Sequence, residues 1–209
     1  MSLQYNHMSQ LVLATNNKHK ISEIRHLLEG KNIQILSSSD FVDFPEIEEN
    51  GQTLDENAII KANTIWSRYH LPCLADDTGL EVDFLNGAPG VFSARFAGEN
   101  CTYNDNNKKL LKLLDGVPLE KRAARFKTVM AYIDAEGGKL TAAGVLEGHI
   151  AMDQRGNFGF GYDPVFIVKG YDRTLAEFTL DEKNEISHRG QALRGIIPQI
   201  IKSLTKIDS

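Results

Sequence analysis

The chain has 209 residues and a formal net charge of −5, with 42% hydrophobic and 24% charged residues. This composition is typical of a globular protein and excludes a disordered or fibrous chain. The acidic balance argues against a broad basic surface for a nucleic-acid polymer, although a few local cations can bind a small anion. We expect an N-terminal extension over residues 1–10 and one domain with two lobes over residues 11–209.

Neither the N-terminus nor the cysteines indicate secretion or membrane insertion. The first ten residues lack the apolar core of a signal peptide, and no apolar run approaches the roughly 20 residues that span a bilayer. Cys73 and Cys101 form neither a CxxC pair nor a disulfide framework. We therefore expect a cytoplasmic protein that has no membrane partner.

The first third of the chain alternates strands and helices. Residues 11–15 form a short apolar run typical of a buried strand, and apolar side chains recur at helical spacing over residues 21–28. A second strand is expected over residues 33–36. The capping box Thr53–Glu56 then begins a helix that continues to Tyr69. This order of elements predicts an α/β fold.

The rest of the chain adds an antiparallel part. Residues 73–75 form an apolar strand, and the leucines of residues 105–114 predict a helix. Residues 124–133 and 139–152 are β-like on either side of a Gly-Gly turn, which predicts a hairpin. Another apolar strand is expected over residues 164–168. We therefore expect a mixed sheet rather than a purely parallel one.

The C-terminal segment has a helical pattern over residues 191–204. Gly195 and Pro198 interrupt that pattern, and proline inside a helix removes one hydrogen bond and crowds the preceding turn. We expect the final helix to be kinked or split.

The loop Thr15–Lys20 lies between a strand and a helix. A helix N-terminus presents unpaired N–H groups and a partial positive charge, and two lysines add to it, so the loop is a candidate phosphate site. A solvated turn whose asparagines cap the helix explains the same residues. No Walker loop and no dinucleotide-binding glycine motif occurs in the chain.

Two groups of carboxylates are candidates for the chemistry. Asp76 and Asp77 follow a buried strand and point in different directions, so one can face a cleft while the other binds the backbone. A plain turn that ends at Gly79 is the alternative. Glu46, Glu48 and Glu49 form an acidic cluster that is either solvated or, with Asp77, a Mg²⁺ site.

Two later segments could recognise a ligand. Phe160–Asp163 combines glycine with aromatic rings, which suits close backbone approach and stacking on a base. Lys183, His188 and Arg189 could read a base edge or hold phosphate. The alternatives are a flexible loop in the first case and, in the second, solvated cations beside a Ser187 helix cap.

Taken together, these segments resemble the inosine triphosphate pyrophosphatase family, also called the HAM1 or non-canonical purine NTP pyrophosphatase family. The matching pieces occur in family order: LVLATNNKHK, EENG with ENAIIKA, LADDTGLEV, GAPGVFSARFAG, FGFGYDPVF and EKNEISHRGQAL. The resemblance implies an α/β fold with a two-lobed mixed sheet, flanking helices and a central substrate cleft. It also implies Mg²⁺-dependent hydrolysis of ITP, dITP and XTP to monophosphate and pyrophosphate, commonly by a homodimer.

The resemblance also implies roles for single residues. Asp77 matches the catalytic carboxylate and a metal ligand, and Glu49 best matches the second metal ligand, with Glu48 as the other possibility. The triphosphate positions are Thr15, Asn16, Asn17, Lys18, His19, Lys20 and Lys61. Thr78 is a substrate neighbour, and the base positions are Phe160, Gly161, Tyr162, Asp163, Lys183, His188 and Arg189.

The sequence departs from the family pattern at two positions. Asn16 replaces the usual glycine of the Thr-Gly-Asn loop, and Thr78 replaces the common serine but keeps the hydroxyl. Two other functions stay open: a Maf-like pyrophosphatase of modified or pyrimidine nucleotides, and a regulatory module that binds nucleotides without turnover. The carboxylates beside a phosphate site argue against the module.

Overall fold

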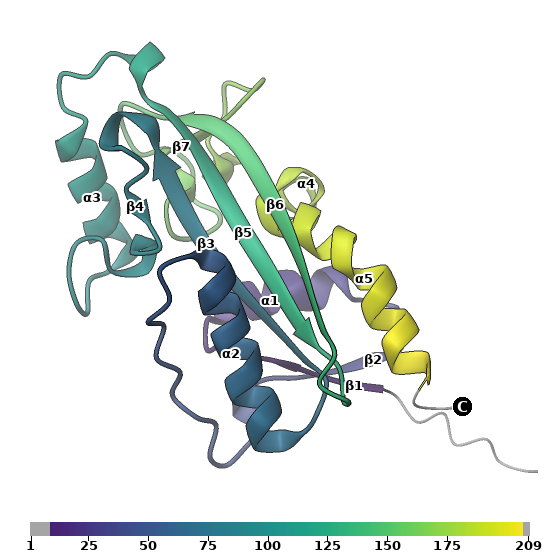
Figure 1. The fold of residues 1–209 in the computed structure, drawn as a ribbon. Coiled ribbons are helices and arrows are strands. Elements are labelled where there is room, and N and C mark those ends of the chain that lie inside the picture. Colours follow the sequence, from purple (N-terminus) through teal and green to yellow (C-terminus); the bar gives the residue numbers. More distant parts are fainter. Residues whose placement is uncertain (1–8, 207–209) are drawn as a thin grey trace, which may run out of the picture.

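A single mixed sheet organises the chain (Figure 1). In the computed structural model, which describes residues 9–206, seven strands form this sheet in the order β2-β1-β3-β5-β6-β7, with β4 paired to β3. Their bounds are β1 (Ser9–Leu13), β2 (Ile33–Leu36), β3 (Cys73–Val82), β4 (Pro89–Gly90), β5 (Ala123–Ile133), β6 (Lys139–Ile150) and β7 (Phe166–Val168). β1 pairs in parallel with β2 and β3, and the other pairs are antiparallel, which confirms the predicted mixed sheet.

Helices cover both faces of the sheet (Figure 1). They are α1 (Lys18–Leu27), α2 (Leu54–Tyr69), α3 (Tyr103–Leu113), α4 (Leu180–Ile186) and α5 (His188–Lys206). α2 packs on β3 and β5, whereas α5 packs on β5 and β6 from the other face, together with α1 and α4. Within residues 9–206, none of these helices has the length and apolar character that a membrane span requires.

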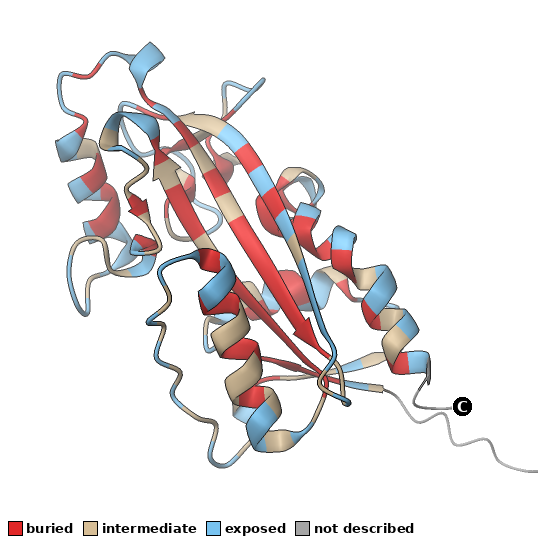
Figure 2. Cartoon of the chain, in the orientation of Figure 1, coloured by how far each residue is buried: buried red, intermediate tan, exposed pale blue. Residues whose placement is uncertain are grey.

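The core follows the alternation of side chains along the strands (Figure 2). On β1, Leu11 and Leu13 pack with α1 and α5, whereas Val12 faces α2. A further buried cluster, which includes Leu80, Leu110 and Phe166, fills the end of the sheet near α3. Burial of these apolar side chains on both faces holds the sheet between its helices.

The edge of β3 contains a gap between two partner strands. β1 pairs with β3 only as far as Leu13 with Leu74, and β4 pairs with β3 only from Leu80. Residues 75–79 therefore pair with β5 alone. The first turns of α1 and α5 and the loop before β7 all lie near this gap, so side chains rather than a strand occupy it.

Two predicted boundaries are wrong. The strand predicted to end at Ala75 continues to Val82, because β5 pairs with every residue of β3 in one antiparallel ladder. Asp76 and Asp77 are therefore inside a strand and not in a turn at its end. β1 begins at Ser9, which pairs with Ile33, so the predicted extension over residues 1–10 includes two sheet residues, and residues 1–8 lie outside the described chain.

The final helix is not split. α5 runs without a break from His188 to Lys206 although Pro198 lies inside it. Its buried side chains, which include Leu193, Ile196 and Ile200, pack against the sheet and offset the hydrogen bond that proline removes. α4 was not predicted, although Thr179 and Glu182 form the same capping box that identified α2.

Two glycines at the contact between α5 and β6 allow a test of how tightly these elements pack. A Cβ atom on Gly144 would lie 2.0 Å from the His188 carbonyl oxygen, so Gly144→Ala forces α5 away from β6 and should lower the unfolding free energy by about 1–3 kcal/mol. Gly195 on α5 has space for a methyl group, 3.7 Å from Ala142 Cβ, so Gly195→Ala should stabilise by about 1 kcal/mol. Urea denaturation measures both, and equal effects would contradict this packing.

Candidate functional site

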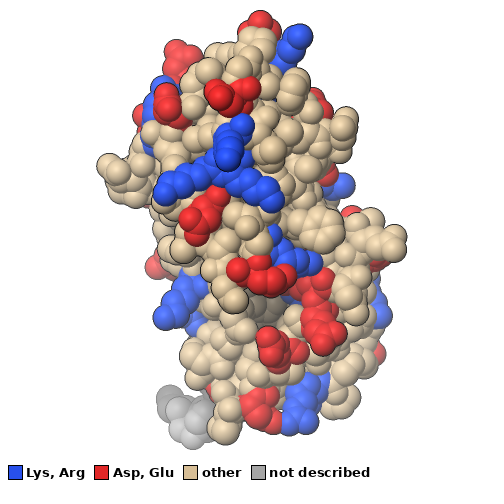
Figure 3. All heavy atoms as spheres, turned by 90° about the vertical axis from the view of Figure 1, so that its left-hand side faces the viewer, with Lys and Arg blue, Asp and Glu red and all other residues tan. Residues whose placement is uncertain are grey.

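A cavity of about 400 Å³ opens at the gap in the edge of β3. Its walls come from the end of β1, the N-terminus of α1, residues 44–49, β3, residues 91–94, residues 160–163 and the start of α5. On the face shown in Figure 3, acidic side chains surround a hollow. Because segments from the whole length of the chain meet here, the fold itself assembles the site.

The cavity brings together most of the predicted site residues. Those that line it are Thr15, Asn16, Asn17, Lys20, Glu49, Lys61, Asp77, Thr78, Phe160, Gly161, Tyr162, Asp163, Lys183, His188 and Arg189. Lys18 and His19 are exposed and do not line it. Glu49 lines the cavity, whereas Glu48 is exposed and does not, which favours the Glu49 register of the acidic loop.

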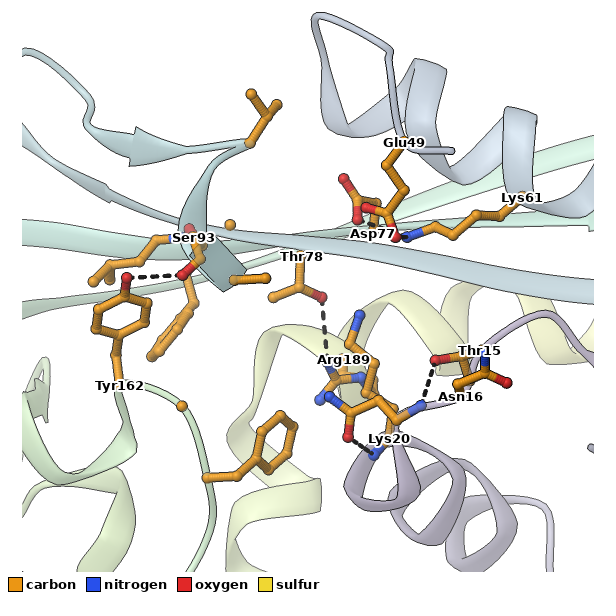
Figure 4. A pocket seen from close by; sticks show the side chains of 18 of the residues that line it. Thr15, Asn16, Lys20, Glu49, Lys61, Asp77, Thr78, Ser93, Tyr162 and Arg189 are labelled. Carbon is orange, nitrogen blue, oxygen red and sulfur yellow. Dashed lines mark hydrogen bonds and ion pairs between the residues drawn. The ribbon is translucent and has the colours of Figure 1, made fainter. Parts of the chain in front are cut away.

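The adjacent carboxylates of β3 face opposite sides of the sheet. Asp77 points toward α2 and lines the cavity, together with Glu49 and Lys61. Asp76 points toward α1 and α5, where it contacts Lys20 and Arg189. Figure 4 shows Glu49, Lys61 and Asp77 on one side of β3 and Lys20 and Arg189 on the other. The expectation that the pair diverges is confirmed, and the period of the strand is the cause.

On the α2 side, Lys61 lies between two carboxylates. Its Nζ is 2.7 Å from Asp77 Oδ1 and 3.2 Å from Glu49 Oε1. Burial lowers the pKa of Lys61, but the charges of Asp77, Asp76 and Glu49 outweigh burial and raise that pKa above its usual value. The amide of Asn57 donates to Asp77 Oδ2 at 3.3 Å, and its oxygen accepts from the Gly51 N–H at 2.8 Å. Asn57 thus joins the acidic loop to the carboxylate.

Glu49 and Asp77 are the candidate magnesium ligands. Both accept from one ammonium group, so their oxygens converge on a single cationic centre. No group of three or more His, Cys, Asp or Glu side chains forms a metal cluster within residues 9–206. Mg²⁺ commonly takes one or two carboxylates and completes its shell with water and phosphate oxygens. The pair therefore fits a magnesium ion that also binds a phosphorylated ligand.

On the other side of β3, a buried ion chain connects five segments: α1, β3, α5, α4 and the loop before β7. It alternates cations and carboxylates in the order Lys20, Asp76, Arg189, Glu23, Lys183 and Asp163. Lys20 Nζ lies 3.0 Å from Asp76 Oδ2, and Arg189 Nη2 lies 3.2 Å from the same oxygen. Three cations and three carboxylates balance, which is the condition under which charges tolerate burial.

Arg189 is at the centre of the buried ion chain. It is 2% exposed and donates to Glu23, to Asp76 and, at 3.2 Å, to Thr78 Oγ1. Burial alone would raise the pKa of Asp76, but Lys20, Arg189 and Lys61 outweigh it and hold that pKa well below its usual range. Asp76 therefore stays ionised, and it anchors the cations that border the cavity.

Lys183 links the buried ion chain to the loop before β7. Its Nζ lies 2.8 Å from Glu23 Oε1 and 2.7 Å from Asp163 Oδ2. Asp163 Oδ2 also accepts from the Phe160 N–H at 2.8 Å, which fixes the backbone of the aromatic loop. Ser187 caps α5 by accepting from the Gly190 N–H, but the neighbouring cations are buried rather than solvated.

His188 is buried at the cavity wall and stacks on Phe126, with ring centroids 4.7 Å apart. Burial, together with the charges of Arg189 and Lys183, lowers the pKa of His188 well below its usual value. The imidazole is therefore neutral at pH 7. Its Nδ1 is buried and has no hydrogen-bond partner within residues 9–206.

The loop Thr15–Lys20 caps α1, as predicted, and also borders the cavity. The Asn17 side chain caps α1 by accepting from the backbone N–H groups of His19 and Lys20, at 3.0 and 3.3 Å. The cap leaves Thr15, Asn16 and Lys20 on the cavity wall. The Asn17 amide also donates to the Tyr103 hydroxyl at 3.1 Å, which ties the loop to α3.

Several cavity residues were missed by the sequence prediction. Phe44 and Ile47 line the cavity from the segment predicted only as acidic and irregular, where their apolar character was the available evidence. Glu23 does not line the cavity but pairs with Lys183 and Arg189, and it was missed because these partners lie about 160 residues later in the sequence. Ser93 binds the Leu80 N–H and accepts from Tyr162 through its carbonyl, and it lies in a segment that matched the family without an assigned role.

The site thus combines a cation-lined helix N-terminus, a carboxylate pair suited to a divalent metal and an aromatic wall. These features define an α/β protein with a cavity for a phosphorylated ligand that carries a flat ring. A family model described as the Ham1 family matches residues 11–199. The chain therefore belongs to the Ham1 family.

Individual relatives agree with this assignment. The chain is 52% identical over 195 residues to a protein named dITP/XTP pyrophosphatase from Thermoanaerobacter pseudethanolicus, covering 93% of this chain and 98% of the relative. A protein of the same name from Porphyromonas gingivalis is 49% identical over 186 residues, covering 89% and 94%. The solved structure of a HAM1 protein from Coxiella burnetii matches with a TM-score of 0.82 and 44% identity, covering 95% of this chain and 100% of that chain.

The neutral state of His188 predicts how stability depends on pH. Below pH 6.5 the unfolded chain protonates this imidazole while the folded chain does not, so stability is full above pH 6.5 and falls as the pH drops toward the lower folded pKa. His188→Gln should flatten the slope of unfolding free energy between pH 7.5 and 5.5 by up to about 1.4 kcal/mol per pH unit. His26→Gln, at an exposed site, is the control. Parallel slopes for wild type and His188→Gln would show that His188 is not held neutral.

Proposed function

We propose that this protein hydrolyses the non-canonical purine nucleoside triphosphates ITP, dITP and XTP to the monophosphate and pyrophosphate. The observation that carries the proposal is one cavity with phosphate-binding groups and a carboxylate pair near one another, and with an aromatic wall and buried donors beyond them. Relatives at about half identity that are named dITP/XTP pyrophosphatase support the same activity. The role in the cell would be removal of deaminated purines from the nucleotide pool.

The triphosphate would lie between α1 and α2. Lys20 and the N-terminus of α1 border the cavity on one side, and Lys61 borders it on the other. Their charges would stabilise the negative charge that grows on the phosphates during the reaction. Lys18 and His19 point elsewhere, so we assign neither of them to the triphosphate.

The carboxylate pair would supply the reaction chemistry. Mg²⁺ bound by Glu49 and Asp77 would neutralise phosphate charge and make pyrophosphate a better leaving group. Asp77 would position the attacking water and accept its proton, since the carboxylate lies on the cavity wall and Asn57 and Lys61 hold its orientation. Lys61, which lies between the two carboxylates, would pair with phosphate oxygens once ligand enters.

The purine would stack on Phe160 with its edge toward the buried donors, since Lys183 Nζ lies only 4.7 Å from the Phe160 ring centroid. Lys183, His188 and Arg189 line this part of the cavity. Donors favour the 6-oxo acceptor of hypoxanthine and xanthine over the 6-amino group of adenine. A buried donor left facing that amino group costs about 1–3 kcal/mol. Guanine also has a 6-oxo group, and we assign no residue to its exclusion.

We also propose that the protein acts as a homodimer in the cytoplasm. The family resemblance supports the dimer, and exposed aromatic side chains such as Phe84 and Phe92 offer apolar surface to a second copy. The absence of paired cysteines in the described chain is consistent with a reducing compartment.

A substrate panel tests the proposed function. ITP, XTP, dITP, dUTP, GTP and ATP are each incubated with and without Mg²⁺, and the products are separated by chromatography. We expect Mg²⁺-dependent release of monophosphate and pyrophosphate from ITP, dITP and XTP in preference to the others. Preference for dUTP would favour the Maf-like alternative, and tight binding without turnover would favour the regulatory module.

The two neighbouring glutamates provide a matched test of the metal site. Glu49→Gln should reduce turnover of ITP and weaken Mg²⁺ affinity, because it removes one of two charges that converge on the cation. Glu48→Gln makes the same chemical change at an exposed side chain and should leave both unchanged. Isothermal titration with Mg²⁺ beside a rate assay measures the pair. Loss of activity in Glu48→Gln alone would contradict the Glu49 assignment.

A further inference from the structure

His19 lies outside the cavity and contacts the aromatic ring that lines it. The His19 and Phe160 rings are stacked, with centroids 5.0 Å apart and an angle of 12° between their planes. Phe160 lines the cavity and His19 does not. The imidazole therefore packs on the Phe160 ring from outside the cavity.

The backbone of His19 is held in place by the start of α1. It follows the cap residue Asn17, whose side chain accepts from the His19 backbone N–H at 3.0 Å. The Asn17 amide is in turn bound to the Tyr103 hydroxyl, and the Tyr103 ring lies 5.9 Å from that of Phe160. Phe160 thus has two aromatic neighbours from separate helices, both fixed by the same capped turn.

Phe160 needs such support because its own loop is permissive. Gly159 and Gly161 flank it with φ angles of 74° and 63°, a region that glycine enters without strain. Residues 152–159 before it are exposed. The backbone bond to Asp163 fixes the N–H of Phe160, but the direction of the ring depends on what packs against it. Besides His19 and Tyr103, the cations of Lys183 and Arg189 lie 4.7 and 5.6 Å from the ring centroid.

We propose that His19 is a positioning residue that holds Phe160 as a fixed stacking platform for the purine base. The inference rests on the proposed function, and it replaces the predicted contact of His19 with phosphate. A ring that is already ordered in the empty site loses less conformational freedom when a base stacks on it, so the base binds more tightly. The platform and the phosphate end also share one element, because Lys20 follows His19 on α1.

Three variants separate this role from a phosphate contact. His19→Ala removes the stacked ring, His19→Phe keeps a ring without the charge or hydrogen bonds of imidazole, and His26→Ala removes an exposed histidine elsewhere on α1 as a matched control. The affinity of each variant for IMP and for pyrophosphate is measured by isothermal titration, and KM and kcat are measured with ITP. His19 is exposed, so all variants should fold, and circular dichroism checks this.

We expect His19→Ala to weaken IMP binding and raise KM about 3- to 10-fold, the range that one aromatic contact supplies. Affinity for pyrophosphate and kcat should stay within about 2-fold, His19→Phe should restore IMP binding, and His26→Ala should match wild type. Loss of pyrophosphate affinity, or failure of His19→Phe to restore IMP binding, would overturn the proposal. Wild type that shows this IMP pattern but does not hydrolyse ITP would overturn only the proposed function. Wild type without IMP affinity would overturn both.

Discussion

The contact of Asp76 with Lys20 and Arg189 holds the site together. Lys20 lies in the first turn of α1 and Arg189 in the first turn of α5, where the helix macrodipole disfavours a cation. Both helices point these positive ends at the gap in the edge of β3. The buried carboxylate of Asp76, with Glu23 on the other side of Arg189, compensates the charge that the two helices bring. Without it, the helix ends would repel one another and the cavity would lose its cationic wall.

Asp76 and Asp77 are adjacent on β3 but lie in different charge environments. Asp76 belongs to a balanced set of buried charges and is closed off by its partners. Asp77, one residue later, belongs to an unbalanced set in which Lys61 faces two carboxylates, and it borders the cavity. A divalent metal ion would balance this excess of negative charge, and it would leave Lys61 free to pair with a triphosphate. The gap between β1 and β4 makes this arrangement possible, because no strand competes for that edge of β3.

Local sequence patterns predicted much of the fold. They failed where contacts with distant segments determine the bounds of an element. The strand at residue 11, the capped α2 and the β5–β6 hairpin follow from periodicity and turn residues within one window. The continuation of β3 past Ala75 depends on its pairing with β5, about 50 residues later, and Pro198 is tolerated because α5 packs on the sheet. Motifs identified the loops that line the cavity, but only the fold shows that Glu23 completes the charges around Arg189, or that His19 stacks on Phe160.

In this account Asp76 stabilises the fold through its ion pairs, whereas Asp77 serves the reaction. The unfolding free energies of Asp76→Asn and Asp77→Asn at pH 7 test this difference most directly. Asp76→Asn leaves three buried cations with two carboxylates and should cost about 3–5 kcal/mol. Asp77→Asn leaves Lys61 paired with Glu49 and should change stability by no more than about 1 kcal/mol, although turnover is lost. Equal losses of stability, or a larger loss for Asp77→Asn, would contradict the account.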